Sequence, residues 1–471
     1  MKEYYADFDA PNPVHTIRND DAIAITANNN EVTYAEFNIL IKEMAGKLEA
    51  AGLREQHRVL VVGDHSDIIA TSVLMWGAMY LGASPANASS NQSKMEIELK
   101  QRSAEADAIL WVDGTIEIMS DLTKTTKQHP EERFLYYTSG TTKKETNLYT
   151  TELGFFNYPN DAERGFGQED DIMMVSKVLG EYTQIRLVSN TPWEIAYTPH
   201  NLVKCLLTGG SFHWVATEAE VPAAHKKYDS NVMSTFPVQF HRLCEFEYDH
   251  PIPFVEVCGG EVTNELIAKM QKNMKVQTIS NSFASSGSGL LFVNLITGPS
   301  TDCSWFEQLP EINVRVKLDE RGQLWTSRGV EWFTDGDLFE EKDGKYKYAS
   351  RGNDEFISAG GGKISVWEIE GYARSAVTDD NTADQLYVFP MDGFRGYPRH
   401  GLIYSGTLDI DVLASTMNLI TGYKQPQMLF QVDEEFWHLY TKISRSHMAD
   451  RIRDNSGYVL RELERKDYNK T

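Results

Sequence analysis

A loop of small hydroxylic residues directly follows an apolar, aromatic run, and residues of these types can hold a phosphate group. After the run Phe134–Tyr137 come Thr138, Ser139, Gly140, Thr141 and Thr142. Their hydroxyls and successive backbone N–H groups could donate hydrogen bonds to phosphate oxygens. Clusters of Ser, Thr and Gly are also common in ordinary surface turns. The loop alone therefore leaves both a phosphate site and a polar turn open.

Four further groups have types suited to binding a nucleotide, although each is ambiguous alone. The Gly-Gly-Glu turn at residues 259–261 follows an apolar run, and glycines let backbone approach a flat ligand. Asp335 and Asp337 could accept hydrogen bonds from a ribose diol, or could simply form a turn. Arg351 could clamp a phosphate, and Lys442 begins a basic segment that could equally be a solvated helix face.

Several classes of function are excluded or disfavoured. The formal net charge of −23 argues against nucleic acid or an anionic membrane as the main partner. The sequence contains no Walker loop, no G-x-S-x-G nucleophile elbow and no H-E-x-x-H pair, and its 12 histidines are scattered. A zinc site is therefore not expected.

The distribution of apolar residues predicts an α/β protein with a large N-terminal domain and a small C-terminal one. Residues 31–53 have helical spacing and end near Gly52, and residues 57–66 contain a β-branched run. Strand and helix patterns alternate up to about residue 300, which indicates βα-built, largely parallel sheets. Period-two runs with turn residues between 311 and 352 indicate antiparallel strands. A smaller α+β region follows, so we place the domains at 1–352 and 353–471.

The sequence favours a cytoplasmic protein without a membrane span. Its four cysteines contain no C-x-x-C pair and are expected to be reduced. The amino terminus has no apolar signal core. The longest apolar stretch, residues 68–83, is too short to cross a bilayer comfortably and predicts a buried helix.

The order of the motifs resembles that of the adenylate-forming superfamily, which comprises acyl- and aryl-CoA synthetases, adenylation domains of peptide synthetases and beetle luciferases. The most specific match is at residues 350–370, where the sequence follows the acyl-CoA synthetase pattern Gly-Arg-x-x-Asp-x-Ile-Ile-x-x-Gly-Gly-x-x-Ile-x-Pro-x-Glu-Ile-Glu with matching spacing. The resemblance covers nearly the whole chain. The five ordered motifs are YYTSGTT, CGGE, WFTDGDL, ASRGNDEFISAGGGKISVWEIE and GYKQPQMLFQVDEEFWHLYTKISR.

The resemblance implies a nucleotide site. The loop from Thr138 to Thr142 would wrap the β- and γ-phosphates of ATP, and Asp337 would accept hydrogen bonds from the ribose hydroxyls. Arg351 would support the ribose and the phosphate. The remaining residues that the resemblance places at the nucleotide are Gly259, Gly260 and Glu261, bordering the adenine, and Ser285 and Ser286 of the next motif.

The resemblance also implies a reaction. A carboxylate and ATP would give acyl-AMP and pyrophosphate, with Lys442 bridging the α-phosphate and the carboxylate and Mg²⁺ neutralising charge. The acyl group would then pass to CoA or to the pantetheine of a carrier protein. A hinge at Asn353 would rotate the small, mobile domain and present its glycine-rich loop, residues 360–362, for this second step.

Several positions depart from the family pattern, and they keep other functions open. Residues 143–146 replace the family's Gly-x-Pro-Lys, and Gly287 stands where the family has a Mg²⁺-binding glutamate. Asp335 replaces a threonine and Thr441 a glycine. The alternatives are a nucleotide- or acyl-adenylate-binding protein with impaired catalysis, and an amino-acid-adenylating protein that loads a separate carrier.

The identity of the acid is not specified by these motifs. The usual aspartate for an α-amino group is missing near residues 191–201, although Glu194 could substitute. The resemblance implies that the acid pocket is built from parts of residues 193–212, 233–241 and 283–290.

Overall fold

The computed structural model describes most of the chain. The described residues are 2–7, 10, 12–92, 94–124, 134–137, 153–156, 168–191, 193, 197–259, 262–285, 289–298, 302–308, 314–327, 332, 334, 336–351, 356–359, 362–378, 385–391, 399–420, 424–432 and 459–463. Statements about structure below concern these residues.

The chain divides into two compact units. Unit 1 contains residues 1–90, 100–137 and 153–350, and unit 2 contains residues 91–99, 138–152 and 351–471. The last change of unit falls beside the boundary that we placed at residue 352. Two short segments of unit 2, residues 91–99 and 138–152, come from the part of the sequence that we assigned to the N-terminal domain.

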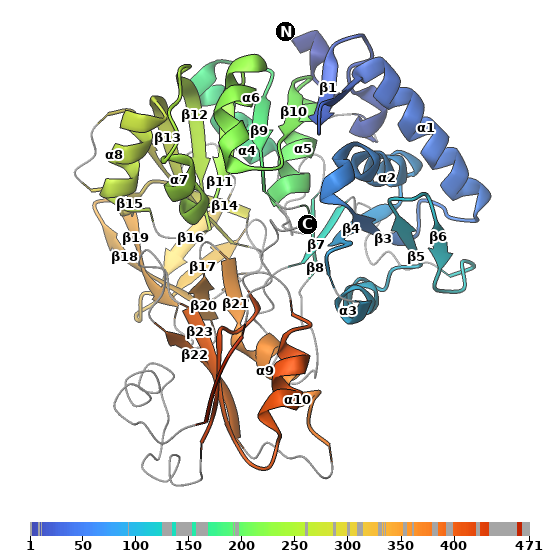
Figure 1. Cartoon of the computed structure of the whole chain (residues 1–471). Coiled ribbons are helices and arrows are strands. Elements are labelled where there is room, and N and C mark those ends of the chain that lie inside the picture. The colour runs from blue at the N-terminus through green and yellow to red at the C-terminus, as the bar shows by residue number, and fades with distance from the viewer. Residues whose placement is uncertain are drawn as a thin grey trace. The chain divides into compact units, whose positions relative to one another are not determined.

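An eight-stranded sheet is the largest element of unit 1 (Figure 1), and six neighbouring strands within it are parallel. Antiparallel strands flank this parallel part at both edges. In spatial order the strands are β14 (Gly289–Ile296), β13 (Val276–Ser285), β12 (Ile252–Val257), β11 (Val232–Thr235), β9 (Arg186–Ser189), β10 (Ser211–Trp214), β1 (Ile23–Ala27) and β2 (Asn30–Thr33).

Two separate hydrophobic cores cover the two faces of this sheet. One core receives apolar side chains from α1 (Tyr34–Ala50), α2 (Ile68–Leu81), α4 (Gln168–Leu179) and α5 (Tyr197–Leu207). The other receives side chains from α6 (Val221–Lys227), α7 (Pro237–Leu243) and α8 (Asn264–Asn273). Helices on both faces of a mostly parallel sheet are the expected arrangement for an α/β protein.

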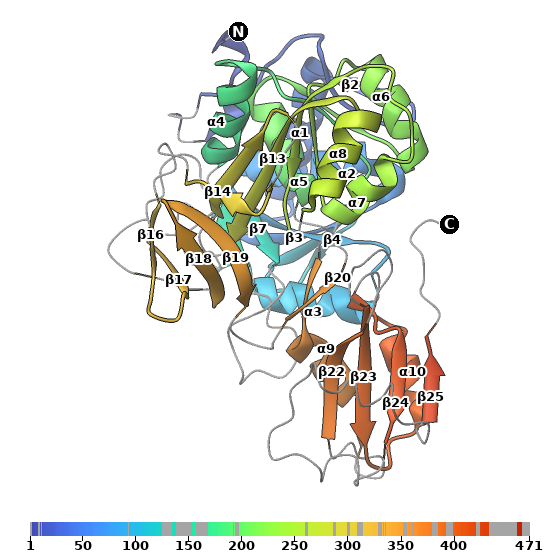
Figure 2. The same ribbon diagram turned by 90° about the vertical axis from the view of Figure 1, so that its left-hand side faces the viewer.

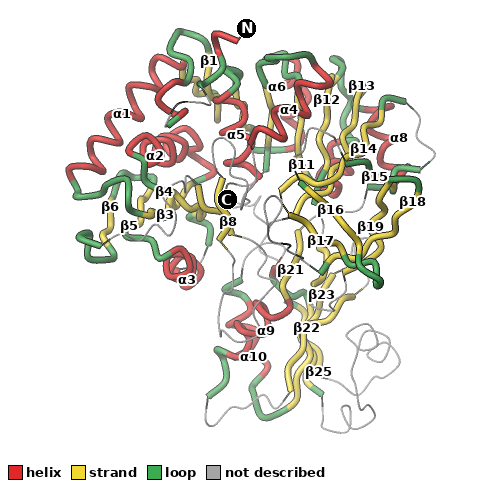
Figure 3. Tube along the Cα trace, turned by 180° about the vertical axis from the view of Figure 1, so that it is seen from behind, coloured by secondary structure: helices red, strands yellow, loops and turns green. Residues whose placement is uncertain are grey.

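A six-stranded sheet forms the second large element of unit 1. In spatial order its strands are β6 (Ile116–Ile118), β5 (Ala108–Trp111), β3 (Arg58–Gly63), β4 (Ser84–Ser89), β7 (Phe134–Tyr137) and β8 (Leu153–Phe156). Helix α3 (Lys94–Ala104) lies in the chain between β4 and β5. Helix α2 packs against β3, β4 and β1, and against α1 (Figure 3). Apolar residues occur on all sides of α2, and ten of its 14 residues are buried in this position between two sheets.

Shorter antiparallel strands complete unit 1. Strands β16 (Arg315–Leu318) and β17 (Leu324–Ser327) form a two-stranded sheet. Strands β15 (Trp305–Phe306), β19 (Lys345–Arg351) and β18 (Asp337–Lys342) form a three-stranded sheet in that spatial order. These pairings confirm the antiparallel texture predicted after residue 311.

Unit 2 is a small α+β structure (Figure 2). A four-stranded sheet contains β22 (Gln385–Met391), β23 (Arg399–Ser405), β24 (Met428–Gln431) and β25 (Val459–Glu462) in that order. Helices α9 (Val366–Arg374) and α10 (Ile410–Met417) cover one face of it with apolar side chains. Strands β20 (Phe356–Ala359) and β21 (Gly362–Ser365) form a separate antiparallel pair.

Local sequence signals explain several boundaries. Thr33 and Glu36 form a reciprocal capping box at the start of α1, and Gly52 takes a φ of +94° just beyond its end. Thr263 caps α8 by accepting a hydrogen bond from the backbone N–H of Leu266. The predicted α/β class, the buried helix in residues 68–83 and the early strands are confirmed. Among the described helices, none has both the length and the hydropathy of a membrane span.

Candidate functional site

The order of strands in the eight-stranded sheet marks one place where a ligand can bind. From β9 the chain crosses through α5 to β10 on one side, whereas β11 leads through α7 to β12 on the other side. The two connections therefore diverge at the carboxyl ends of β9 and β11. In open α/β sheets, ligands bind in the crevice beyond such a topological switch point. The carboxyl ends of β9, β11 and β12 are thus the candidate site.

A buried ion pair lies beneath these strand ends, on the face that α5 covers. Lys204 of α5 places its Nζ 2.9 Å from Oε2 of Glu256 on β12. Both residues are almost completely inaccessible to solvent. Burial of two charges is costly unless each is paired and hydrogen-bonded. The pair is therefore a strong constraint on how α5 sits over the sheet.

Ser234 connects this ion pair to an aromatic side chain at the edge of the sheet. Ser234 and Glu256 are register partners in the parallel β11–β12 pair, so their side chains lie on the same face. The Oγ of Ser234 is 2.6 Å from Oε2 of Glu256 and 2.8 Å from the hydroxyl oxygen of Tyr197. Tyr197 is the first residue of α5 and lies seven positions before Lys204.

The chemistry of the groups fixes the direction of these hydrogen bonds. A carboxylate only accepts, so the single hydroxyl proton of Ser234 is donated to Glu256. In the contact between Ser234 and Tyr197, the tyrosine hydroxyl therefore donates and the serine oxygen accepts. Burial raises the pKa of the Tyr197 hydroxyl well above its usual value, which keeps the phenol protonated at neutral pH. The tyrosine hydroxyl is thus hydrogen-bonded to a protein group.

A second polar cluster lies at the carboxyl ends of β9 and β11. The hydroxyl of Thr191 is 3.2 Å from the hydroxyl of Thr235 and 3.3 Å from Oε1 of Gln239. The amide nitrogen of Gln239, on α7, donates to Oδ1 of Asn190 across 2.5 Å. These bonds tie the loop after β9 to the start of α7. Both sides of the crevice are therefore fixed by hydrogen bonds.

Three half-buried side chains form the accessible rim of the site. Tyr197 begins α5, Phe236 directly follows β11, and Cys258 directly follows β12. The rings of Tyr197 and Phe236 have centroids 5.6 Å apart and are tilted by 34°. Beyond Cys258 the chain turns at Gly259, where φ is +79°, a conformation that favours glycine.

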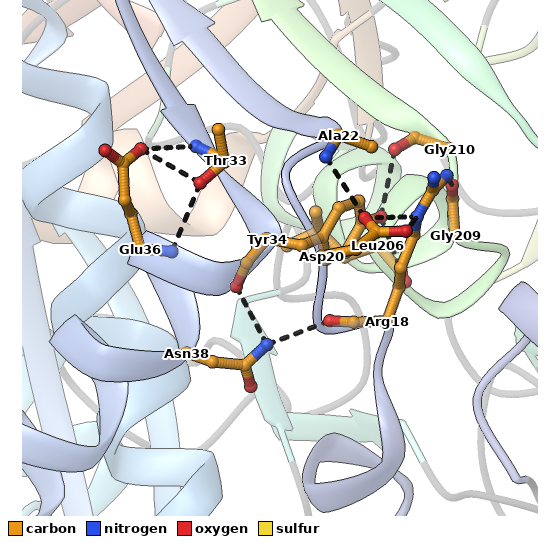
Figure 4. A network of polar contacts seen from close by, with 10 residues as sticks. All are labelled: Arg18, Asp20, Ala22, Thr33, Tyr34, Glu36, Asn38, Leu206, Gly209 and Gly210. Atoms are coloured by element: carbon orange, nitrogen blue, oxygen red, sulfur yellow. Dashed lines mark hydrogen bonds and ion pairs between the residues drawn. The ribbon is translucent and has the colours of Figure 1, made fainter.

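A network at the other end of α5 holds that helix in place (Figure 4). The hydroxyl of Tyr34 donates to the carbonyl of Gly210 across 2.9 Å, and the guanidinium of Arg18 donates to the carbonyl of Gly209 across 3.2 Å. Asp20 pairs with Arg18 at 2.7 Å. Because carbonyls near a helix end lack helical partners, these donors satisfy groups that would otherwise be exposed or orphaned.

Asp337 occupies a defined position at the start of β18. The preceding Gly336 has a φ of +80°, and Asp337 itself is 1% exposed. Phe339, two residues along the same strand face, packs edge-to-face on Phe283 of β13, with 4.9 Å between ring centroids. Ser285 is two residues beyond Phe283 and ends β13. The structure thus brings β18, which carries Asp337, against β13.

Many of the predicted site residues lie outside the described part of the chain. For Ser285 and Arg351 the structure describes the backbone only, at the ends of β13 and β19. Gly259 and Asp337 are described as above, and the roles of all these residues stay predictions. The predicted residues outside the described part are Thr138, Ser139, Gly140, Thr141, Thr142, Gly260, Glu261, Ser286 and Lys442.

A metal site cannot be assigned to particular residues. Within the described ranges, no three His, Cys, Asp or Glu side chains gather closely enough to hold an ion. Gly287, which stands at the position of the family's metal-binding glutamate, is outside those ranges.

The buried polar cluster was not found from the sequence, although one signal pointed to it. Glu256 is the single charge in the otherwise apolar strand Ile252–Val257, and Lys204 is the single charge in the apolar part of α5. An isolated charge in each of two buried elements suggests that the two charges are paired. Only the strand order shows that these two residues, 52 positions apart, meet.

Comparison with known proteins gives one curated relative, and no protein-family model matches the chain. The chain is similar to one of the subunits of mycosubtilin synthase from Bacillus subtilis, with 27% identity over 199 residues. The match covers 38% of this chain but only 7% of that relative. The chain therefore corresponds to a small part of the synthase polypeptide that it matches.

Solved structures resemble the chain over nearly its whole length. A variant of o-succinylbenzoate CoA synthetase from Bacillus subtilis has a TM-score of 0.73 and 15% identity, covering 93% of this chain and 97% of its own. The adenylation domain AlmE of Vibrio cholerae has a TM-score of 0.71 and 14% identity, with coverages of 93% and 96%. The amide bond synthetase McbA of Marinactinospora thermotolerans has a TM-score of 0.66 and 14% identity, with coverages of 87% and 93%.

Proposed function

The chain has the fold of the adenylate-forming enzymes, as its motifs predicted, and we propose that it activates a carboxylic acid with ATP. The products of this step are acyl-AMP and pyrophosphate. A thiol, from CoA or from the pantetheine of a carrier protein, then receives the acyl group. The chain would accordingly be an AMP-forming acid–thiol ligase.

The position of Asp337 is the observation that carries this proposal. Its carboxylate is held at the first residue of β18, behind a glycine of positive φ, and its strand packs on β13. In a chain of this fold, an aspartate in this motif is the expected acceptor for the two ribose hydroxyls. A carboxylate with two oxygens matches the two donors of a ribose diol.

Other residues would complete the nucleotide site. We assign the phosphates to the loop from Thr138 to Thr142 and the adenine to the turn formed by Gly259, Gly260 and Glu261. Ser285 and Ser286 would lie beside the nucleotide at the end of β13. Loop N–H groups and hydroxyls provide many donors for phosphate oxygens without a covalent step.

Formation of the adenylate needs orientation and charge stabilisation. A carboxylate oxygen attacks the α-phosphorus, a new P–O bond forms, and the bond to the leaving pyrophosphate breaks. Lys442 would stabilise the negative charge on the α-phosphate and carboxylate, and Arg351 would hold the ribose and phosphate. Mg²⁺, when bound to ATP, would neutralise part of the phosphate charge.

The second half-reaction would use unit 2. The thiol attacks the acyl carbonyl, a C–S bond forms, and AMP leaves with the bridging oxygen. We propose that a hinge at Asn353 rotates the small domain, residues 353–471, so that the loop at 360–362 replaces Lys442 at the site. The agreement of residues 350–370 with the acyl-CoA synthetase pattern favours CoA as the acceptor.

Specific observations favour two alternative functions. Similarity to part of a mycosubtilin synthase and to an adenylation domain solved with glycyl-adenosine-5′-phosphate supports an amino-acid-adenylating protein that loads a carrier. The glycine at position 287, in place of a metal-binding glutamate, supports a nucleotide- or adenylate-binding protein with impaired catalysis.

We also propose that the reaction takes place in the cytoplasm. ATP and CoA are available there, and all four cysteines are free thiols. Reduced cysteines agree with a reducing compartment.

Exchange of labelled pyrophosphate into ATP tests the proposed activity. The assay contains Mg²⁺ and a panel of fatty, aromatic and amino acids, with wild type and Lys442→Ala compared. We expect exchange with at least one acid, and a loss of about 10²- to 10³-fold in the variant, because one charge-stabilising donor is removed.

Lys345→Ala is the matched control. Lys345 is an exposed lysine of β19 that pairs with Glu307, so its removal should leave exchange within about twofold of wild type. Equal activity of wild type and Lys442→Ala would contradict the assignment of Lys442. Absence of exchange with every acid, while ATP still binds, would favour the impaired binding protein.

A further inference from the structure

The hydrogen bonds beneath the strand ends determine which part of Tyr197 a substrate can meet. Tyr197 donates its proton to Ser234, which donates to Glu256, which is paired with Lys204. The hydroxyl is therefore used inside the protein. The ring remains half-buried at the rim of the site. What Tyr197 presents to a ligand is consequently an aromatic surface and not a polar group.

Neighbouring side chains hold this ring in a fixed orientation. His200, one turn along α5, is buried and parallel to Tyr197, with 6.2 Å between ring centroids and 8° between planes. Phe236 lies beside Tyr197 with its own ring half-buried. The two rings come from the ends of elements that diverge at the switch point. Together they form a rigid aromatic wall at the rim.

The charges at this edge are already balanced. Oε2 of Glu256 lies 2.9 Å from the ammonium group of Lys204 and 2.6 Å from the hydroxyl of Ser234. The carboxylate of Glu256 is thus paired with a positive charge. A substrate ammonium group placed against the two rings would have to lose part of its hydration. An uncharged aromatic ring has no such hydration free energy to lose.

We propose that the activated acid is an aromatic carboxylic acid whose ring packs against Tyr197 and Phe236, with Ser234, Glu256 and Lys204 as positioning residues for the tyrosine. This proposal rests on the function proposed above and adds the substrate class. Offset and tilted aromatic pairs are favoured beyond the area that they bury, whereas saturated chains gain only the area. The wall should therefore discriminate flat rings from saturated rings of the same size.

Matched acids test this proposal directly. The ratio of kcat/KM for benzoate to kcat/KM for cyclohexanecarboxylate, and the same ratio for longer aryl and cyclohexyl acids, is measured by pyrophosphate exchange. We expect the ratio for the better-fitting pair to be tenfold or more in wild type. Tyr197→Leu should lower it about fivefold, and Tyr197→Phe, which keeps the ring but loses the hydrogen bond to Ser234, should lower it less.

The positioning role needs a different readout. In the double variant Lys204→Met with Glu256→Gln no buried charge is left unpaired, so the variant should fold even where a single change fails. Loss of positioning should raise KM for the aryl acid several-fold and leave KM for ATP unchanged. A change of both KM values, or of neither, would overturn this role.

The outcomes separate this inference from the proposed function. Exchange that is equal for aryl and saturated acids, or strongest with fatty or amino acids, overturns the aromatic assignment while the ligase activity stands. Exchange with no acid at all overturns the ligase, and the substrate class falls with it. A wild-type aryl preference that Tyr197→Leu leaves unchanged overturns the assignment to this wall.

Discussion

The buried carboxylates beneath the eight-stranded sheet of unit 1 and the four-stranded sheet of unit 2 have different hydrogen-bond partners. Under the four-stranded sheet of unit 2, Oε1 of Glu370 accepts a hydrogen bond from the backbone N–H of Val388 at 2.8 Å. The carboxylate of Glu370 therefore serves as an acceptor for a backbone N–H group. Under the eight-stranded sheet of unit 1, Glu256, Lys204 and Ser234 satisfy one another and hold Tyr197 at the strand ends. The buried ion pair thus lies beneath the topological switch point of the sheet.

This difference agrees with the position of the candidate site, whose described residues lie in unit 1. The face of the unit 2 sheet beneath α9 and α10 is lined by apolar side chains such as Leu386, Val388 and Leu402. Within the described residues, the polar cluster at the strand ends belongs entirely to unit 1.

Among these variants, removal of the Glu256 side chain should lower the free energy of unfolding the most. Glu256→Ala removes the carboxylate that pairs with the buried ammonium group of Lys204, and the free energy of unfolding should fall by about 3 to 5 kcal/mol. Urea denaturation followed by circular dichroism measures the change. Glu265→Ala, which removes an exposed partner of Lys269 on α8, should cost under about 1 kcal/mol. Similar values for the two variants would show that the buried pair has no special role.

A substitution at Gly209 should disturb the anchor of α5. Gly209 has a φ of +65°, and an added Cβ would lie 2.3 Å from the carbonyl oxygen of Tyr4. Gly209→Ala should therefore destabilise the protein by about 2 to 3 kcal/mol. Gly298→Ala is the matched control, because a Cβ there meets nothing within 4 Å. A melting temperature of Gly209→Ala equal to that of the control would argue that this anchor is not needed.

The other face of the same sheet should give a pH-dependent stability. Burial lowers the pKa of His213 from 6.5 to about 3, with Arg186 and Lys227 adding to the effect. Below pH 6.5 the unfolded chain binds a proton that the folded chain does not, so stability falls as the pH drops towards 3. The slope should be about 1.4 kcal/mol per pH unit in this window. The free energy of unfolding is measured between pH 4 and 7 for wild type and His213→Gln. Below pH 6.5 it should fall more steeply in wild type, by this slope, and parallel curves would contradict the prediction.

Removal of Glu370 should have the smallest effect. Glu370→Ala leaves the N–H of Val388 without this acceptor, and unit 2 should lose about 1 kcal/mol of stability. Glu370→Gln keeps an acceptor and should lose less. Hydrogen exchange at Val388 reports on the bond itself. A loss for Glu370→Ala as large as that for Glu256→Ala would remove the contrast between the two sheets.

The sequence predicted the features that depend on neighbouring residues. The helix predicted in residues 31–53, with its end near Gly52, rests on local patterns, and the structure contains it as α1. The alternation of strands and helices likewise predicted the α/β class. These signals act within one turn or one strand, so a single sequence displays them.

The buried cluster could not be predicted in the same way. Its residues come from α5, β11 and β12, and their contact depends on β9 and β11 being neighbours with connections that diverge. Strand order is a property of the assembled sheet and has no local pattern. Asp337 and Arg351 could be identified because they lie in motifs whose residue types and spacing resemble those of the adenylate-forming superfamily. Tyr197 and Glu256 lie outside those motifs.

Isotope transfer tests the central claim most directly. The acid is labelled with ¹⁸O in both carboxyl oxygens and incubated with wild type, ATP, Mg²⁺ and CoA. If a carboxylate oxygen attacks the α-phosphorus, that oxygen stays with the phosphate when the thiol takes the acyl group. We predict AMP with one ¹⁸O atom per thioester formed, measured by mass spectrometry. Unlabelled AMP, or ADP as the nucleotide product, would contradict an acyl-adenylate reaction.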